Sequence, residues 1–111
     1  MQEKNSMMGN ADMLVLKLLA EKDMYGYQIT EELKKRSQNV FAMKAGTLYP
    51  LLHTLETKQM VSSYDMQSGG RMRKYYSITN VGRDALAQKE ESWKTFSAAI
   101  ERILTEGTYG I

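Results

Sequence analysis

The chain has 111 residues, 42% of them hydrophobic and 25% charged, which is typical of one globular domain and excludes a disordered or fibrous protein. It holds no cysteine and one histidine, His53, which excludes disulfides, thiolate zinc sites, iron–sulfur clusters and cysteine nucleophiles. No apolar run approaches the ~20 residues that cross a bilayer, and residues 1–20 do not resemble a secretion signal. We therefore expect a cytoplasmic protein with no metal and no cofactor.

The net charge of +2 conceals an uneven distribution. Residues 34–74 contain eight Lys or Arg and two Asp or Glu, a balance of +6, whereas the remainder contains seven and eleven, a balance of −4. A polyanion would meet the middle of the chain. The alternative is that these charges only solvate a surface, and their placement on secondary structure must decide.

The first half of the chain predicts two helices. Residues 1–9 show no sustained periodicity, so we expect a flexible N-terminal arm there. Apolar residues at helical spacing predict a helix over residues 10–21 and a second over residues 26–37. The basic run at 34–36 falls in the last turn of the second helix, where the helix dipole favours cations, so part of it needs no ligand.

A third helix is predicted over residues 45–58, with Pro50 close to its N-terminal turn, where a proline is tolerated. Its inward positions, at offsets of 0, 3, 4 and 7, are Leu48, Leu51, Leu52 and Leu55. Its outward positions are Thr47, Tyr49, His53, Thr54 and Lys58. Lys58 can only donate hydrogen bonds, and the other four outward side chains can donate and accept them. None of the five is acidic, so none would repel phosphate.

Residues 60–66 and 72–78 are predicted to form a β-hairpin around Ser68-Gly69-Gly70, because glycine accepts the positive φ of a tight turn. Strand alternation places Arg71, Arg73 and Tyr75 on one face of the return strand, and Met72, Lys74, Tyr76 and Ile78 on the other. Tyr75 and Tyr76 fit core packing better than base stacking, which needs a groove of several aromatic residues.

A long helix over about residues 80–105, capped by Thr79, completes the chain. Its apolar seam consists of Leu86, Trp93, Phe96, Ile100 and Ile103. At ~1.5 Å per residue this helix would extend ~39 Å, too far to lie wholly on so small a domain, so we expect it to pair with a second copy of the chain.

This order predicts a mainly α fold with a small β-hairpin (α+β), a winged helix-turn-helix with a long C-terminal dimerisation helix. The expected divisions are a DNA-binding domain over 10–79, a dimerisation helix over 80–106 and a tail over 107–111. The expected partner is double-stranded DNA, and the expected DNA-binding residues are Lys44, Thr47, Tyr49, His53, Thr54, Arg71, Arg73 and Lys74.

Alternatives remain open for single residues and for the whole chain. Tyr49 either bonds a phosphate or only covers a junction between helices, and Lys58 is explained equally well as solvated charge. A winged helix also serves as a protein-interaction adaptor, which would not need Arg71, Arg73 and Lys74 to be cationic together. An enzyme is the weakest interpretation, because the chain has no paired carboxylate motif and no phosphate-binding glycine loop.

Over almost all of residues 11–104 the chain resembles the PadR-like transcriptional regulators. The resemblance is carried by Tyr25-Gly26-Tyr27-Gln28-Ile29, Gly46-Thr47-Leu48-Tyr49-Pro50, Leu55-Glu56, Gly70-Arg71-Met72-Arg73-Lys74-Tyr75-Tyr76, Thr79, Gly82, Leu86 and Trp93. It implies a homodimeric winged-helix repressor whose C-terminal helix forms the dimer contact and whose activity a small molecule relieves.

The chain departs from the family pattern at Thr54, Gln59, Tyr64 and Met72, where relatives often have arginine, glycine, tryptophan and proline. Thr54 matters for function, because an arginine on the reading helix would supply a bidentate contact to phosphate or guanine. Base preference is therefore not carried over from relatives.

Trp93 at heptad spacing is either a packing residue or a ligand contact. The resemblance favours the second role, because in some relatives the equivalent tryptophans of two subunits flank a planar aromatic effector, often cationic. Phe96 and neighbouring methionines would complete such a site, and Glu90 or Glu101 would balance the positive charge of the effector.

Overall fold

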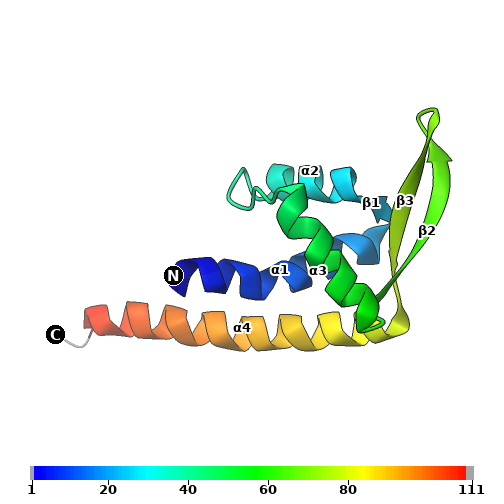
Figure 1. Ribbon diagram of the computed structural model, residues 1–111. Helices are drawn as coiled ribbons and strands as arrows, with labels where there is room; N and C mark the ends of the chain where they lie inside the picture. The colour runs from blue at the N-terminus through cyan, green and yellow to red at the C-terminus, as the bar shows by residue number, and fades with distance from the viewer. Residues whose placement is uncertain (1, 110–111) are drawn as a thin grey trace.

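A computed structural model describes residues 2–109, with side chains described for residues 9–106. The elements follow in the order α1 (Gln2–Glu21), β1 (Met24–Tyr25), α2 (Gly26–Arg36), α3 (Ala45–Thr57), β2 (Val61–Ser68), β3 (Arg71–Ile78) and α4 (Asn80–Tyr109). The predicted α+β class and the winged helix-turn-helix order are confirmed. α4 lies alongside α1 and runs beyond it, and the molecule measures 63 Å in its longest direction (Figure 1). Within the described part of the chain, none of these helices has the length and apolar character needed to cross a membrane.

Both terminal helices are longer than expected. α1 begins at Gln2, so residues 2–9, where a flexible arm is predicted, are helical, and Met1 lies outside the described residues. The segment lacks an apolar period, but it contains good helix formers and no proline, so nothing in it ends the helix. α4 continues to Tyr109, so most of the predicted tail is helical, and residues 110–111 lie outside the described residues.

The hairpin is also longer than predicted, because both strands reach the turn and leave only Gly69 and Gly70 between them. These glycines have φ values of 62° and 80°, the left-handed conformation that a two-residue type I′ turn demands. The sheet has the order β1-β3-β2, and β1 was not predicted, since two residues are too few to show alternation. β1 pairs only with Tyr75 and Tyr76 of β3, at the base of the hairpin.

The inward face of α3 is buried in one core shared by all four helices and the sheet. Leu48, Leu52 and Leu55 are buried as expected, while Leu51 is partly exposed at the edge of the core. Pro50 is the sixth residue of α3 and not part of its first turn, which corrects the expected position. The missing amide leaves the carbonyl of Gly46 without its helical donor, but both residues are exposed, so water can replace that bond.

A compact joint ties the end of α3 to the start of α4. Gln59 takes a left-handed φ of 62° after α3, and the hydroxyl of Thr79 donates to its carbonyl oxygen at 2.7 Å. The Thr79 amide donates to the Met60 carbonyl at 3.0 Å, and the Thr79 hydroxyl accepts from the Gly82 amide at 3.0 Å, which confirms Thr79 as the cap of α4. A Cβ at Gly82 would collide with the Met60 carbonyl, so only glycine fits there.

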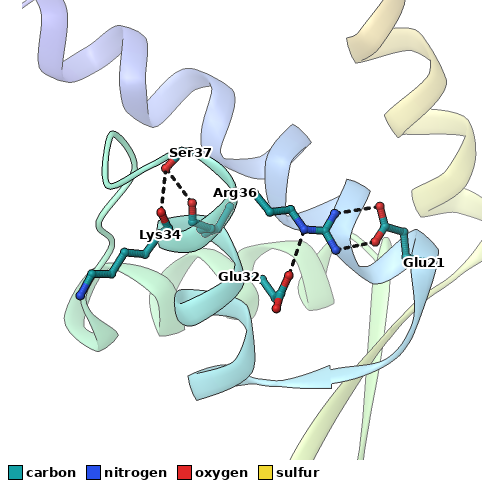
Figure 2. A network of polar contacts seen from close by, with 6 residues as sticks. Glu21, Glu32, Lys34, Arg36 and Ser37 are labelled. Atoms are coloured by element: carbon teal, nitrogen blue, oxygen red, sulfur yellow. Dashed lines mark hydrogen bonds and ion pairs between the residues drawn. The ribbon is translucent and has the colours of Figure 1, made fainter.

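The end of α2 is fastened to α1 by an arginine between two glutamates (Figure 2). Both terminal nitrogens of Arg36 donate to the Glu21 carboxylate, at 2.9 and 2.7 Å, and its Nε donates to Glu32 at 2.9 Å. The Lys34 side chain points away from this network (Figure 2). Arg36 therefore has an internal role, as expected for part of the basic run, and it lowers the pKa of the Glu21 carboxyl.

Replacing Glu21 by Gln tests this link through its pH dependence. Because the folded-state pKa of Glu21 is lowered, its contribution to stability is fully present above the ordinary value of 4.5 and is lost as the pH falls through the folded-state value. We expect Glu21→Gln to lower the free energy of unfolding at neutral pH by a small amount, since both partners are exposed, and this difference should shrink at acidic pH. Urea unfolding at several pH values measures it, and a difference that grows below pH 4.5 would contradict the assignment.

Candidate nucleic-acid interface

The outward face of α3 carries exposed polar groups and no acid in its first turn. Burial of the three leucines on the opposite side leaves Tyr49, His53 and Thr54 exposed. Lys44 is the exposed N-cap residue, and Thr47 is half-buried in the first turn. The structure thus brings all five residues predicted on this helix to one end or one face of it. Of these, Lys44 and Thr47 lie at the N-terminus, where the first amides have no partner within the helix.

Tyr49 links α3 to the beginning of α2. Its ring and hydroxyl lie so close to Gly26 that a Cβ there would overlap them, which explains the glycine at the first position of α2. The sequence left two roles open for Tyr49. The ring covers the helix junction, as one of them requires, and Tyr49 is 48% exposed, so its contact with phosphate stays a prediction.

A hollow of about 390 Å³ lies between the first turns of α2 and α3, lined by residues of both helices. It includes Tyr27 and Thr30, which the sequence prediction omitted from the interface. Tyr27 is 64% exposed, and Thr30 donates its hydroxyl hydrogen bond to the Tyr27 carbonyl at 2.8 Å. The sequence feature that could have indicated Tyr27 is its aromatic side chain directly after Gly26. Only the packing of α2 against α3 shows that Tyr27 borders the same surface as Tyr49.

The projecting hairpin, β2 and β3, forms the wing, which stands to one side of the helices (Figure 1). Arg71 follows the glycine turn, and Lys74 faces outward from the opposite face of β3. Both side chains are exposed and form no hydrogen bond or ion pair with any described residue. These two cations are therefore available to an external anion.

The aromatic residues at the base of the wing are packed, as expected from the sequence. Tyr75 and Tyr76 are both buried, which excludes them as an exposed stacking platform. The Tyr75 ring stacks on Tyr64 at 5.7 Å and meets Tyr25 edge-on at 5.3 Å. Burial raises the pKa of Tyr76, so its hydroxyl stays neutral at physiological pH.

Arg73 differs from the other wing cations because its guanidinium is engaged within the chain. Its Cζ lies 4.4 Å from the centre of the Tyr25 ring, and its Nε donates to the Ser68 carbonyl at 3.1 Å. The residue is half-buried, whereas Arg71 is exposed. Arg73 thus shares a face of β3 with Arg71, as predicted, but it points toward the body of the protein.

One residue predicted for the apolar seam of α4 does not lie on its exposed face. Leu86 is only 7% exposed and packs into the core of its own chain, so it is not available to a partner. The same heptad spacing runs through Leu86, which packs inside the chain, and through the exposed apolar residues that follow it. The sequence does not mark the point at which the internal contact ends and the exposed face begins. Beyond Leu86 the exposed apolar side chains are Trp93, Phe96, Ile100, Ile103 and Leu104.

An open cleft of about 560 Å³ lies between α1 and α4 beside this apolar face. Trp93, Phe96 and Met13 contribute to its lining, and the two aromatic rings are 6.3 Å apart. The acid in the lining is Asp12, which pairs with Lys89 at 2.8 Å, whereas the expected Glu90 and Glu101 do not line the cleft. Within residues 9–106 no cluster of His, Asp and Glu has the form of a metal site.

Comparison with known proteins gives consistent matches. The model of the transcriptional regulator PadR-like family matches residues 15–88, which include α2, α3, the wing and the start of α4. The chain is 35% identical over 74 residues to the transcriptional regulator Rv3488 of Mycobacterium tuberculosis, covering 67% of this chain and 66% of that protein.

Solved structures agree over a longer stretch. A transcriptional regulator from Clostridium thermocellum is 31% identical with a TM-score of 0.81, covering 88% of this chain and 96% of that one. A PadR family transcription regulator from Clostridium difficile R20291 is 36% identical with a TM-score of 0.75, covering 86% of this chain and 98% of that one.

Proposed function

The chain belongs to the PadR-like family of transcriptional regulators, and we propose that it acts as a homodimeric repressor that binds double-stranded DNA through α3 and the wing. In winged helix-turn-helix proteins the third helix enters the major groove and the hairpin touches the flanking backbone. A repressor of this kind works in the cytoplasm and needs no cofactor, as expected from the sequence. The family is one of regulators and not of enzymes.

The observation that carries the proposal is the distribution of unpaired cations and hydroxyls. Arg36 and Lys89 are held in ion pairs away from α3, and Arg73 is engaged with Tyr25. Lys44, Arg71 and Lys74, in contrast, make no side-chain bond to the described residues and lie at α3 and on the wing. Charge that is free to meet phosphate therefore occurs on the two elements that a winged helix presents to DNA.

Replacing Arg71 by Gln and Tyr49 by Phe tests the DNA interface. Arg71→Gln removes one exposed charge from each subunit, so we expect affinity to fall at least tenfold on every duplex, since a hydrogen bond to a charged group contributes ~1.5–3 kcal/mol. Tyr49→Phe keeps the ring against Gly26 and removes only the hydroxyl, so we expect a loss of a few-fold, larger on the cognate duplex. Fluorescence anisotropy with genomic fragments retained by the protein, titrated at several salt concentrations, measures both.

Lys94→Gln is the matched control, because it removes the same charge from an exposed site on α4 and should leave affinity unchanged. The protein-interaction adaptor is the competing function. It predicts no preference among duplexes and a salt dependence near zero for the unmodified protein, and that result would end the DNA-binding proposal.

The apolar face of α4 supports the dimer part of the proposal. Ile103 and Leu104 are 72% and 70% exposed, and with Phe96 and Ile100 they form an apolar face on one side of a 30-residue helix. A face of this size on a small protein indicates a protein contact. A second copy of α4 has the matching seam spacing.

Ile103→Lys should dissociate the dimer, because burying an unpaired ammonium in an apolar seam costs several kcal/mol unless it reaches water. The side chain is exposed in the single chain, so the fold should remain intact. Ala98→Lys lies on the opposite side of α4 and is the control that should leave the dimer unchanged. Sedimentation showing equal dimer stability for both variants would place the subunit contact elsewhere.

The cleft between α1 and α4 supports a regulatory site for a planar aromatic effector. Trp93 and Phe96 offer ring faces, and the Asp12 carboxylate offers a partner for a cation after release from Lys89. Release of DNA further requires that the effector prefer a dimer geometry in which the two α3 helices no longer match the groove spacing.

A planar cationic dye should quench the fluorescence of Trp93, the single tryptophan of the chain, in a saturable manner. Lys89→Gln should strengthen binding several-fold by freeing Asp12, while leaving a neutral planar dye unaffected. Trp93→Phe should weaken the binding of both dyes, measured by dye anisotropy. Saturable binding with no change in DNA affinity would remove the regulatory role, and no saturable quenching would remove the site.

A further inference from the structure

The outer part of the wing has little support from the rest of the chain. β1 pairs only with Tyr75 and Tyr76, so β3 from Arg71 to Lys74 has β2 as its sole strand neighbour within the described residues. Figure 1 shows this part projecting as a two-stranded ribbon. Such a ribbon is only marginally ordered in water without further packing. A wing that must reach a fixed position on DNA therefore needs a brace.

Arg73 spans the distance from the body of the protein to the turn of the wing. Its guanidinium lies over the Tyr25 ring, with Cζ 4.4 Å from the ring centre, while its Nε donates to the Ser68 carbonyl at 3.1 Å. It also passes beside Gly69, where a Cβ would lie 3.5 Å from Nη2. One side chain thus contacts the last residue of β2, the turn, and a residue outside the hairpin.

The residue that Arg73 contacts outside the hairpin is itself fixed. Tyr25 is the N-cap of α2, and its amide donates to the Gln28 side chain at 3.1 Å. Its ring packs edge-on against Tyr75, which stacks on Tyr64, and the Tyr64 hydroxyl donates to Asp23 at 2.7 Å. The ring under Arg73 is therefore part of a continuous packed row that reaches from α2 across the base of the sheet.

We propose that Arg73 is a positioning residue, which holds the wing at a set angle to α2 and α3, and that Arg71 and Lys74 alone among the wing cations bind DNA phosphate. This assignment replaces the phosphate contact expected for Arg73 from the sequence, and it rests on the proposed DNA-binding function. One face of the guanidinium and its Nε donor serve the protein fold, whereas Arg71, two residues earlier on the same face of β3, makes no such contact with the described residues.

The first experiment needs no DNA. Arg73→Gln should raise amide hydrogen exchange over residues 65–72 by roughly two- to tenfold, the range expected for loss of a cation–π contact. Tyr25→Leu should also raise exchange over these residues, and the double variant should raise it by less than the product of the two single effects, because both changes remove the same cation–π contact. Tyr25→Phe retains the ring and should behave as the unmodified protein, and Arg71→Gln is the matched control that should leave exchange unchanged.

The second experiment separates positioning from phosphate contact by salt dependence. In a dimer, Arg71→Gln should reduce the slope of log affinity against log salt by about 2, since each lost phosphate contact changes it by ~0.9. Arg73→Gln and Tyr25→Leu should each lower affinity several-fold with the slope unchanged. A reduced slope for Arg73→Gln, together with wild-type affinity for Tyr25→Leu, would make Arg73 a phosphate contact and overturn the proposal.

The two experiments distinguish failure of the proposed DNA binding from failure of the proposed role of Arg73. If the unmodified protein binds no duplex, the proposed function is wrong, yet the exchange comparison still shows whether Arg73 braces the wing. If exchange over residues 65–72 is the same in Arg73→Gln and Arg71→Gln, the brace is wrong whatever the protein binds.

Discussion

The joint between α3 and α4 determines how every proposed contact is arranged in space. The Thr79 amide and hydroxyl bond the carbonyls of Met60 and Gln59, and the absent side chain of Gly82 lets the first turn of α4 press against Met60. The helix that carries the proposed DNA-binding side chains is thus fixed to the helix that carries the exposed apolar face. In the proposed dimer, a change in how the two α4 helices pair would therefore also move the two α3 helices.

The positive charge of the chain serves two physical purposes that composition alone does not separate. Arg36 and Lys89 fasten α1 to α2 and to α4, and Arg73 fastens the hairpin to Tyr25. These three cations make their contacts within the protein. Lys44, Arg71 and Lys74 remain unpaired on exposed sites at α3 and the wing, so they add to the field that an approaching polyanion meets there. A charge count over residues 34–74 does not separate Arg36 and Arg73, which bond within the protein, from Lys44, Arg71 and Lys74.

Local patterns predicted most of the fold. The leucine spacing of α3, the double glycine of the turn and the cap of α4 each depend on residues close together in the sequence, and all three appear in the structure. What the sequence missed depends on distant partners or on the lack of a signal. The contact between Arg73 and Tyr25 joins separate elements, Leu86 fits an internal core and an external seam equally well, and the start of α1 has no apolar period to mark it.

In the proposed dimer, the two α3 helices enter successive major grooves of the same duplex. Hydroxyl-radical footprinting of the purified protein on a genomic fragment that it retains tests this most directly, because it shows the spacing and symmetry of the contacts together. We expect two protected regions related by inverted symmetry, with centres about one helical turn, ~10 base pairs, apart. A single asymmetric region, or uniform protection that does not depend on sequence, would contradict it.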